Sequence, residues 1–168
     1  MIPERIRWAV ETLAVEPGDR LLEIGGGTGL AASLVCERLD NGSLLVIDRS
    51  TTAIERTRRR NQEHVVSGRL ALETLDIADF DPGKAGFDKV FAINVNVFWT
   101  TPANEELART RRALDHDGRL FLFYDTPSAA RARQAIARVV DALRANGFAE
   151  PQPISRSATL VGCVAHLA

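Results

Sequence analysis

The chain has little cysteine. Cys36 and Cys163 are the two cysteines in 168 residues, and their spacing matches no metal-ligand pattern. We therefore expect both to be small buried side chains in a reducing compartment. This scarcity argues against a cysteine-based metal centre and against a secreted domain held together by disulfides.

Long apolar runs are also missing. No stretch approaches the roughly 20 apolar residues that a membrane-spanning helix needs. The first residues, Met1 to Arg7, carry charge too early for a secretory signal peptide. We expect a cytoplasmic protein without membrane insertion.

Charge of one sign is not in excess either, since 21 Lys and Arg face 22 Asp and Glu. Nucleic-acid binders usually carry a strong basic field, so we expect no nucleic-acid partner and a small-molecule one instead. The one dense basic run, Arg56 to Arg60, would spread around more than one side of a helix, which favours a solvated face. An anionic substrate or a lipid headgroup is the alternative for this run.

Apolar segments alternate with helical patterns along the whole chain, which is typical of a single α/β domain over residues 1–168. Such alternation predicts a Rossmann-like, doubly wound, mostly parallel seven-stranded sheet with an antiparallel C-terminal strand and helices on both faces. We expect strands at 20–24, 43–47, 69–75, 87–93, 119–124, 152–155 and 159–165. Helices are expected at 2–15, 30–39, 52–64, 102–114 and 128–146, with loop 81–86 and turn 116–118 preceding the fourth and fifth strands.

A glycine-rich turn follows the first predicted strand, with Gly25, Gly26, Gly27 and Gly29 directly after Glu23-Ile24. Such a turn lets a ligand approach the backbone and offers free N–H groups at a helix N-terminus. Dinucleotide-binding folds typically contain Gly-x-Gly-x-x-Gly, and this chain has Leu30 at the position of the third glycine. Together with Glu23, the motif resembles the first motif of class I S-adenosylmethionine-dependent methyltransferases, and the resemblance extends over nearly the whole chain.

The resemblance implies that the glycine loop wraps the methionine part of S-adenosylmethionine and that Glu23 helps to hold its ammonium group. It places Asp48, in the segment Val46 to Ser50 that includes Arg49, at the ribose hydroxyls. Asp76 would accept from the adenine amino group with Ile77 beside the ring, although Asp79 could take that role instead. The alternatives are a tight turn for the glycines, a helix N-terminal charge for Asp48 and a solvated turn for Asp76.

The fourth predicted strand ends in Asn94-Val-Asn96-Val-Phe98-Trp99, which we expect to line the methyl-transfer site. Family members that methylate amino or amide groups often have two prolines and an aromatic after the polar residue, and this chain lacks both prolines. Asn94 could accept from the methionine ammonium or, with Asn96, orient the acceptor. Phe98 and Trp99 would form an aromatic wall, or else pack against the next helix.

The resemblance implies an enzyme that transfers a methyl group from S-adenosylmethionine to a small molecule by in-line displacement, leaving S-adenosylhomocysteine and needing no metal. Asp125, just past the fifth predicted strand, is the carboxylate best placed to accept the acceptor's proton. Two alternatives stay open: a silent cofactor-binding module or subunit of a heteromeric enzyme, suggested by the short chain, and a nicotinamide-dependent oxidoreductase. Pairing into a homodimer could close the substrate side.

Overall fold

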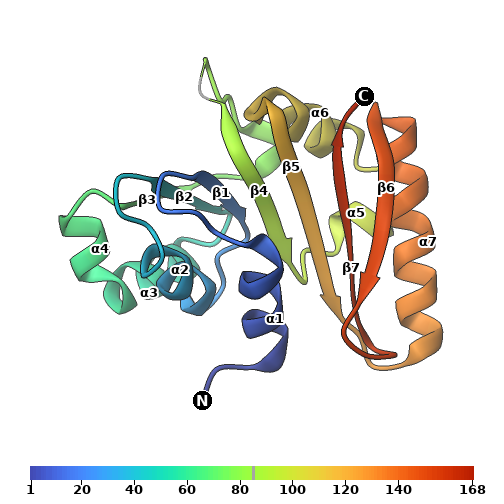
Figure 1. Ribbon diagram of the computed structural model, residues 1–168, viewed down its shortest axis with the longest axis horizontal. Helices are drawn as coiled ribbons and strands as arrows, with labels where there is room; N and C mark the ends of the chain where they lie inside the picture. Colours follow the sequence, from blue (N-terminus) through green and yellow to red (C-terminus); the bar gives the residue numbers. More distant parts are fainter. Residues whose placement is uncertain (85) are drawn as a thin grey trace.

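A computed structural model describes residues 1–84 and 86–168, so that Ala85 of the predicted loop 81–86 lies outside the described residues. The strands are β1 (Arg20–Ile24), β2 (Ser43–Asp48), β3 (Leu70–Thr74), β4 (Phe87–Ile93), β5 (Leu114–Asp125), β6 (Phe148–Ser155) and β7 (Leu160–Leu167). They form one sheet in the order β3-β2-β1-β4-β5-β7-β6 (Figure 1). β7 runs antiparallel to both of its neighbours, whereas the pairs among β1 to β5 are parallel. The predicted fold class is confirmed.

Helices cover both faces of the sheet because the strands are apolar on both faces. The helical segments are α1 (Glu4–Leu13), α2 (Leu30–Cys36), α3 (Thr51–Arg60), α4 (Gln62–Val66), the 3-10 turn η1 (Ile77–Asp79), α5 (Val97–Thr100), α6 (Asn104–Ala113) and α7 (Ala129–Ala145). One core joins α1, α2 and α3 to the sheet through Leu21, Val46 and Phe121, and the other joins α5, α6 and α7 through Leu22 and Leu122. The strand order reverses between β1 and β4, where a ligand crevice is expected in such sheets.

The predicted helix 52–64 is in fact two helices, α3 and α4, which meet at Asn61. Asn61 has φ −118° and ψ 31°, outside the helical region, and its backbone N–H donates to carbonyl oxygens of Thr57 and Arg58. Its side chain is 1% exposed and engaged in tertiary hydrogen bonds. The helix therefore ends at Asn61, whose side chain bonds to residues outside the helix. Helical periodicity in the sequence does not predict such bonds.

The predicted turn 116–118 lies inside β5, which begins at Leu114 and not at Arg119. Phe87 of β4 pairs with Leu114 and Lys89 pairs with Arg119, so residues 115–118 bulge out of the ladder. The turn residues thus bend the strand without ending it, because pairing with β4 continues on both sides of the bulge. α5 and η1 were not predicted, and the remaining elements agree with their predicted positions to within a few residues.

Candidate functional site

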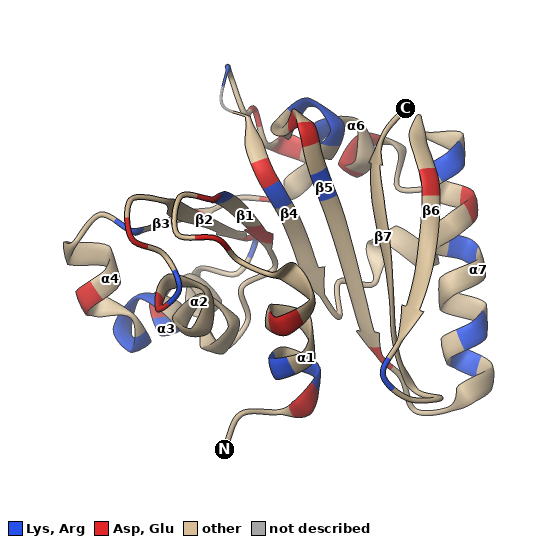
Figure 2. Cartoon of the chain, in the orientation of Figure 1, with Lys and Arg blue, Asp and Glu red and all other residues tan. Residues whose placement is uncertain are grey.

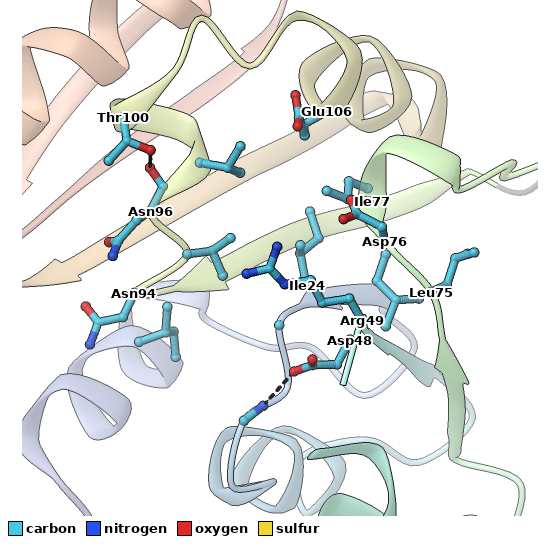
Figure 3. Close-up of a pocket in the computed structure, with 16 residues that line it drawn as sticks. Ile24, Asp48, Arg49, Leu75, Asp76, Ile77, Asn94, Asn96, Thr100 and Glu106 are labelled. Atoms are coloured by element: carbon cyan, nitrogen blue, oxygen red, sulfur yellow. Dashed lines mark hydrogen bonds between the residues drawn. The ribbon is translucent and has the colours of Figure 1, made fainter. Parts of the chain in front are cut away.

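A cavity of about 630 Å³ opens where β1, β2 and β4 end, at the reversal of the strand order (Figure 3). Eight of the predicted site residues line it: Gly25, Gly27, Asp48, Arg49, Asp76, Ile77, Asn94 and Asn96. They come from four separate stretches of sequence, and the parallel strands bring those stretches to one edge of the sheet. Glu23, Gly26, Gly29, Trp99 and Asp125 are not among the lining residues.

The glycine loop passes close to the segment that follows β4. Gly25 has φ +78°, and a Cβ atom built on it would lie 2.7 Å from Cγ2 of Val95. Only glycine fits both the left-handed backbone and this approach. The Gly25 N–H donates to the Ile47 carbonyl at 2.8 Å, which fastens the start of the loop to β2.

Asp48 ends β2 and lies beside the glycine loop at the cavity, with a hydrogen bond between them (Figure 3). Its Oδ2 accepts from the N–H of Gly27 at 3.3 Å, and its Oδ1 accepts from the N–H of Ser50 at 2.8 Å. A carboxylate held by two backbone donors has a fixed direction and still offers further lone pairs to a ligand. Contact with ribose hydroxyls stays a prediction. Arg49, next in sequence, also lines the cavity.

Asp76 both caps a turn and lines the cavity. Its Oδ1 accepts from the N–H of Ala78 at 3.0 Å, so it is the N-cap of η1, as the turn interpretation expected. The adjacent Ile77 is 5% exposed and contributes an apolar part of the wall. Capping leaves the second carboxylate oxygen available, so the two interpretations of Asp76 are compatible. Asp79 does not line the cavity.

Glu23 is buried under the glycine loop, with 2% of the residue exposed. It lies on the same face of β1 as Leu21, toward α1 and α2, and its Oε2 has no hydrogen-bond partner within residues 1–84 and 86–168. Burial, aided by the nearby Asp48 carboxylate, raises the pKa of Glu23 well above its usual range. Direct contact with the cofactor's ammonium group stays a prediction, and the structure places Glu23 behind the loop.

Asn94 turns the chain sharply at the end of β4. Its φ of +58° is unusual for a residue other than glycine, and its Oδ1 accepts from the N–H of Asp125 at 2.8 Å. The next residue, Val95, is held by the Tyr124 hydroxyl, which donates to its carbonyl at 3.1 Å. Two side-chain contacts to β5 thus fix the rim of the cavity where the acceptor was predicted to bind.

The predicted aromatic wall does not face the cavity. Phe98 and Trp99 belong to α5 and are 1% and 8% exposed, and Trp99 lines a separate groove beside α7. Its Nε1 donates to Oδ1 of Asn96 at 3.2 Å, and the Arg131 guanidinium lies 5.1 Å from its ring centre. Both aromatic side chains are packed in the core, but α5 lies against α7 and not chiefly against the next helix, α6, as the packing alternative expected. A role for Trp99 at the acceptor stays a prediction.

Asp125 lies at the end of β5, beside Asn94 but outside the cavity lining. Its carboxylate pairs with Arg5 of α1 at 3.7 Å, and the two side chains are 43% and 37% exposed. Screening by solvent makes such a pair weak, so Asp125 can exchange this partner for another. Its role as a proton acceptor stays a prediction.

Among the polar lining residues, sequence reasoning missed two, Thr100 of α5 and Glu106 of α6. The Thr100 hydroxyl donates to the carbonyl of Asn96 at 2.9 Å. The Glu106 backbone carbonyl accepts from the Thr110 hydroxyl at 2.8 Å, whereas the Glu106 carboxylate makes no hydrogen bond or ion pair with any described residue. Glu106 stands in the first turn of α6, where an acidic residue is ordinarily read as a helix-dipole charge. No feature of the neighbouring sequence marked Glu106 as a cavity residue.

These residues fit the cofactor that the resemblance implies. The cavity volume is within the roughly 300–1,000 Å³ of small-molecule sites. Carboxylates at Asp48 and Asp76 suit hydroxyl and amino donors, while Ile47 and Ile77 supply apolar surface for a base. Within the described residues, no group of three or more His, Cys, Asp or Glu could hold a metal ion. None of the described helices combines the length and the apolar character that crossing a bilayer requires.

Comparison with protein families finds a match to the family described as "Methyltransferase domain" over residues 22–120. This range includes the glycine loop, Asp48, Asp76 and the segment after β4, and it is more than half of the chain.

Two curated proteins illustrate the range of relatives. The Bacillus subtilis (strain 168) protein YrhH, named as a candidate methyltransferase, is 27% identical over 132 residues, which are 79% of this chain and 72% of that protein. A tRNA1(Val) (adenine(37)-N6)-methyltransferase of Vibrio campbellii is 33% identical over 66 residues, which are 39% of this chain and 28% of that enzyme. The chain thus spans well under half of the second relative.

Solved structures share the fold. A TehB-like SAM-dependent methyltransferase from Corynebacterium glutamicum superposes with a TM-score of 0.74 at 15% identity, covering 100% of this chain and 89% of that one. At this level of identity, the likeness speaks for the fold alone.

Proposed function

We propose that this chain, which belongs to the methyltransferase domain family and has S-adenosylmethionine as its cofactor, methylates a small-molecule acceptor in the cavity after β1, β2 and β4. The observation that carries the proposal is the convergence of the glycine loop, Asp48, Asp76 and Asn94 on one cavity. The two ends of that cavity differ, since the carboxylates come from the β2 and β3 side and the amides from the segment after β4.

The proposed roles follow from the chemistry of each side chain. S-adenosylmethionine supplies a methyl group already bound to a sulfonium leaving group, so the chain mainly aligns the reactants and excludes water. Asp48 accepts from the ribose hydroxyls, and Asp76 with Ile77 receives the adenine. Glu23 acts on the ammonium end from behind the loop. Arg49 contributes a cation to the same wall.

Asn94 and Asn96 orient the acceptor on the opposite side of the cavity. A neutral amine can attack without a base, whereas a hydroxyl must lose its proton as it reacts, and Asp125 is our candidate to accept that proton. Trp99 would act on the acceptor indirectly, through Asn96, because its indole N–H donates to the Oδ1 of Asn96. The bond from its indole N–H makes Trp99 a support for the acceptor side.

Charge favours a small acceptor over a nucleic acid. Besides Arg49, the cavity wall carries Asp48, Asp76 and Glu106, which would repel a phosphate backbone. The arginines gather on α3, on α6 and on α7 (Figure 2), and α3 and α7 pack against opposite ends of the sheet. A basic path past the cavity is not part of this proposal, and the relative named as a tRNA methyltransferase makes RNA the natural rival acceptor.

Calorimetry followed by an acceptor panel tests the proposal. We expect purified protein to bind S-adenosylhomocysteine but not NADH, and to transfer labelled methyl groups to a small molecule. Transfer to bulk tRNA alone would replace the small acceptor with RNA. Binding without turnover on either panel would favour the silent module, and tight NADH binding alone would favour an oxidoreductase.

Two further parts of the proposal concern the whole protein. We expect it to act in the cytoplasm, because its acceptor is a dissolved small molecule, and a homodimer is a candidate for closing the acceptor side. Light scattering with and without S-adenosylhomocysteine measures the oligomeric state. A monomer under both conditions would remove the dimer from the proposal.

A further inference from the structure

Asn61 joins α3 to the end of the glycine loop through a buried amide. Its Nδ2 donates to the carbonyl of Gly29 at 3.0 Å and to the carbonyl of Thr57 at 3.0 Å. Its Oδ1 accepts from the hydroxyl of Ser33 in α2 at 2.6 Å. Two carbonyl oxygens facing one end of the amide fix which end is NH₂, since a flipped amide would set oxygen against oxygen.

A second contact from the same turn of α3 holds the neighbouring loop residue. The Arg60 Nε donates to the carbonyl of Thr28 at 2.9 Å. The last residue of α3 and the C-cap residue that follows it therefore bind consecutive carbonyls of the loop. The fit is close, because a Cβ atom added to Gly29 would lie 2.9 Å from Cα of Thr57.

The contact reaches the cavity through the loop's own hydrogen bond. The Gly29 N–H donates to the Gly26 carbonyl at 3.0 Å, closing a turn that contains Gly27. Gly27 lines the cavity and donates to Asp48. Because a trans peptide is planar, holding the Gly29 carbonyl toward α3 also points the Leu30 N–H away from α3.

We propose that Asn61 is a positioning residue for cofactor binding, which together with Ser33 and Arg60 keeps the glycine loop in its binding shape before the cofactor arrives. This inference rests on the proposed use of the glycine loop for S-adenosylmethionine. Asn61 itself touches neither cofactor nor acceptor, since it is 1% exposed and does not line the cavity. Its effect is preorganisation, which lowers the ordering cost of binding.

Asn61→Ala tests the proposal against a matched control, Asn146→Ala. Asn146 is likewise the C-cap of its helix, α7, and its Nδ2 donates to the carbonyl four residues before it at 2.9 Å, but it contacts no part of the loop. We expect Asn61→Ala to weaken S-adenosylhomocysteine binding by about tenfold, measured well below the unfolding midpoint. Asn146→Ala should stay within about twofold of wild type.

Hydrogen exchange without ligand supplies a readout that is independent of binding. Asn61→Ala should speed exchange at residues 26–33, whereas Asn146→Ala should leave that segment unchanged. If the two variants matched each other in both affinity and loop exchange, the proposal would be wrong. If wild type bound no S-adenosylhomocysteine, the proposed function would fail, while exchange would still decide whether Asn61 orders the loop.

Two milder pairs cover the case in which Asn61→Ala does not fold. Ser33→Ala should reproduce part of the weakening, and Ser33→Thr, which keeps a hydroxyl, should restore it. Arg60→Ala should weaken binding by about two- to fivefold. Arg59→Ala is its control, because the Arg59 side chain is exposed on the same helix and makes no hydrogen bond or ion pair with the described residues. Wild-type affinity in both Ser33→Ala and Arg60→Ala would overturn the proposal.

Discussion

The two sides of the cavity are held in different ways. On the glycine-loop side, hydrogen bonds join residues far apart in sequence, 21 apart for Gly27 and Asp48 and 32 apart for Gly29 and Asn61. On the side after β4, Asn96 is bonded to Trp99 and Thr100, only three and four residues away. The first side is thus fixed by the tertiary fold. On the second side, Asn94 and Val95 are bonded to β5 over 31 and 29 residues, and Asn96 alone depends on one short helix. We therefore expect a preformed glycine loop and, beyond Val95, an acceptor-side segment at Asn96 that can change on its own.

Gly29→Ala should disturb the glycine-loop side of the cavity more than the other substitutions do. The new Cβ would meet the backbone of Thr57 at a φ of +78°, so we expect a loss of about 2–4 kcal/mol in unfolding free energy and no detectable S-adenosylhomocysteine binding. Gly68→Ala is the control, because its φ is +80° but nothing lies within 4 Å. Gly68→Ala should lower the free energy of unfolding by about 1–2 kcal/mol and leave S-adenosylhomocysteine binding unchanged. Urea unfolding and calorimetry measure both, and equal losses would mean that close packing is unimportant.

Asp48→Ala should weaken S-adenosylhomocysteine binding by more than tenfold, because the ribose hydroxyls and the Gly27 N–H would lose their hydrogen-bond acceptor. Asp81→Ala is a matched control, since Asp81 also accepts from the backbone two residues ahead, at Gly83, but lies outside the cavity lining. Calorimetry on both variants decides the point. Unchanged affinity in Asp48→Ala would remove Asp48 from the site.

Glu23→Gln should change how stability depends on pH. Burial raises the pKa of Glu23 in the folded state, so the folded protein holds a proton that the unfolded chain releases above about pH 4.5. This proton difference makes wild-type stability fall as pH rises from that point until the raised pKa is passed. The variant lacks this group, so we expect its free energy of unfolding to fall less than that of wild type between pH 4 and pH 7.5. Parallel stability curves from urea unfolding would contradict the buried ionisation.

Asn96→Ala should have the smallest effect and separate the two sides. Losing one short-range hydrogen bond to Trp99 should lower turnover about three- to fivefold and leave S-adenosylhomocysteine affinity within about twofold. Initial rates and calorimetry on the same preparation test this. If cofactor affinity fell as much as turnover, the division between the two sides would be wrong.

Local patterns were enough for most of the fold. The predicted bounds of β1 and β4 match the structure, because each strand is a short apolar run between turn residues. Patterns failed at Asn61 and at residues 115–118, where a bond to another element or pairing with a neighbouring strand overrode the local preference. They also missed Glu106, whose place in the cavity depends on how α6 packs.

The sequence by itself determined the glycine loop, the carboxylates after β2 and β3 and the amide after β4, because each follows directly from a motif at a strand end. Tertiary structure alone decided which of these share a cavity and which lie behind it. It buried Glu23 beneath the loop, turned Trp99 toward α7 and paired Asp125 with Arg5. The physical reason is that side-chain direction and burial depend on packing between segments distant in the chain, which spacing along the chain does not record.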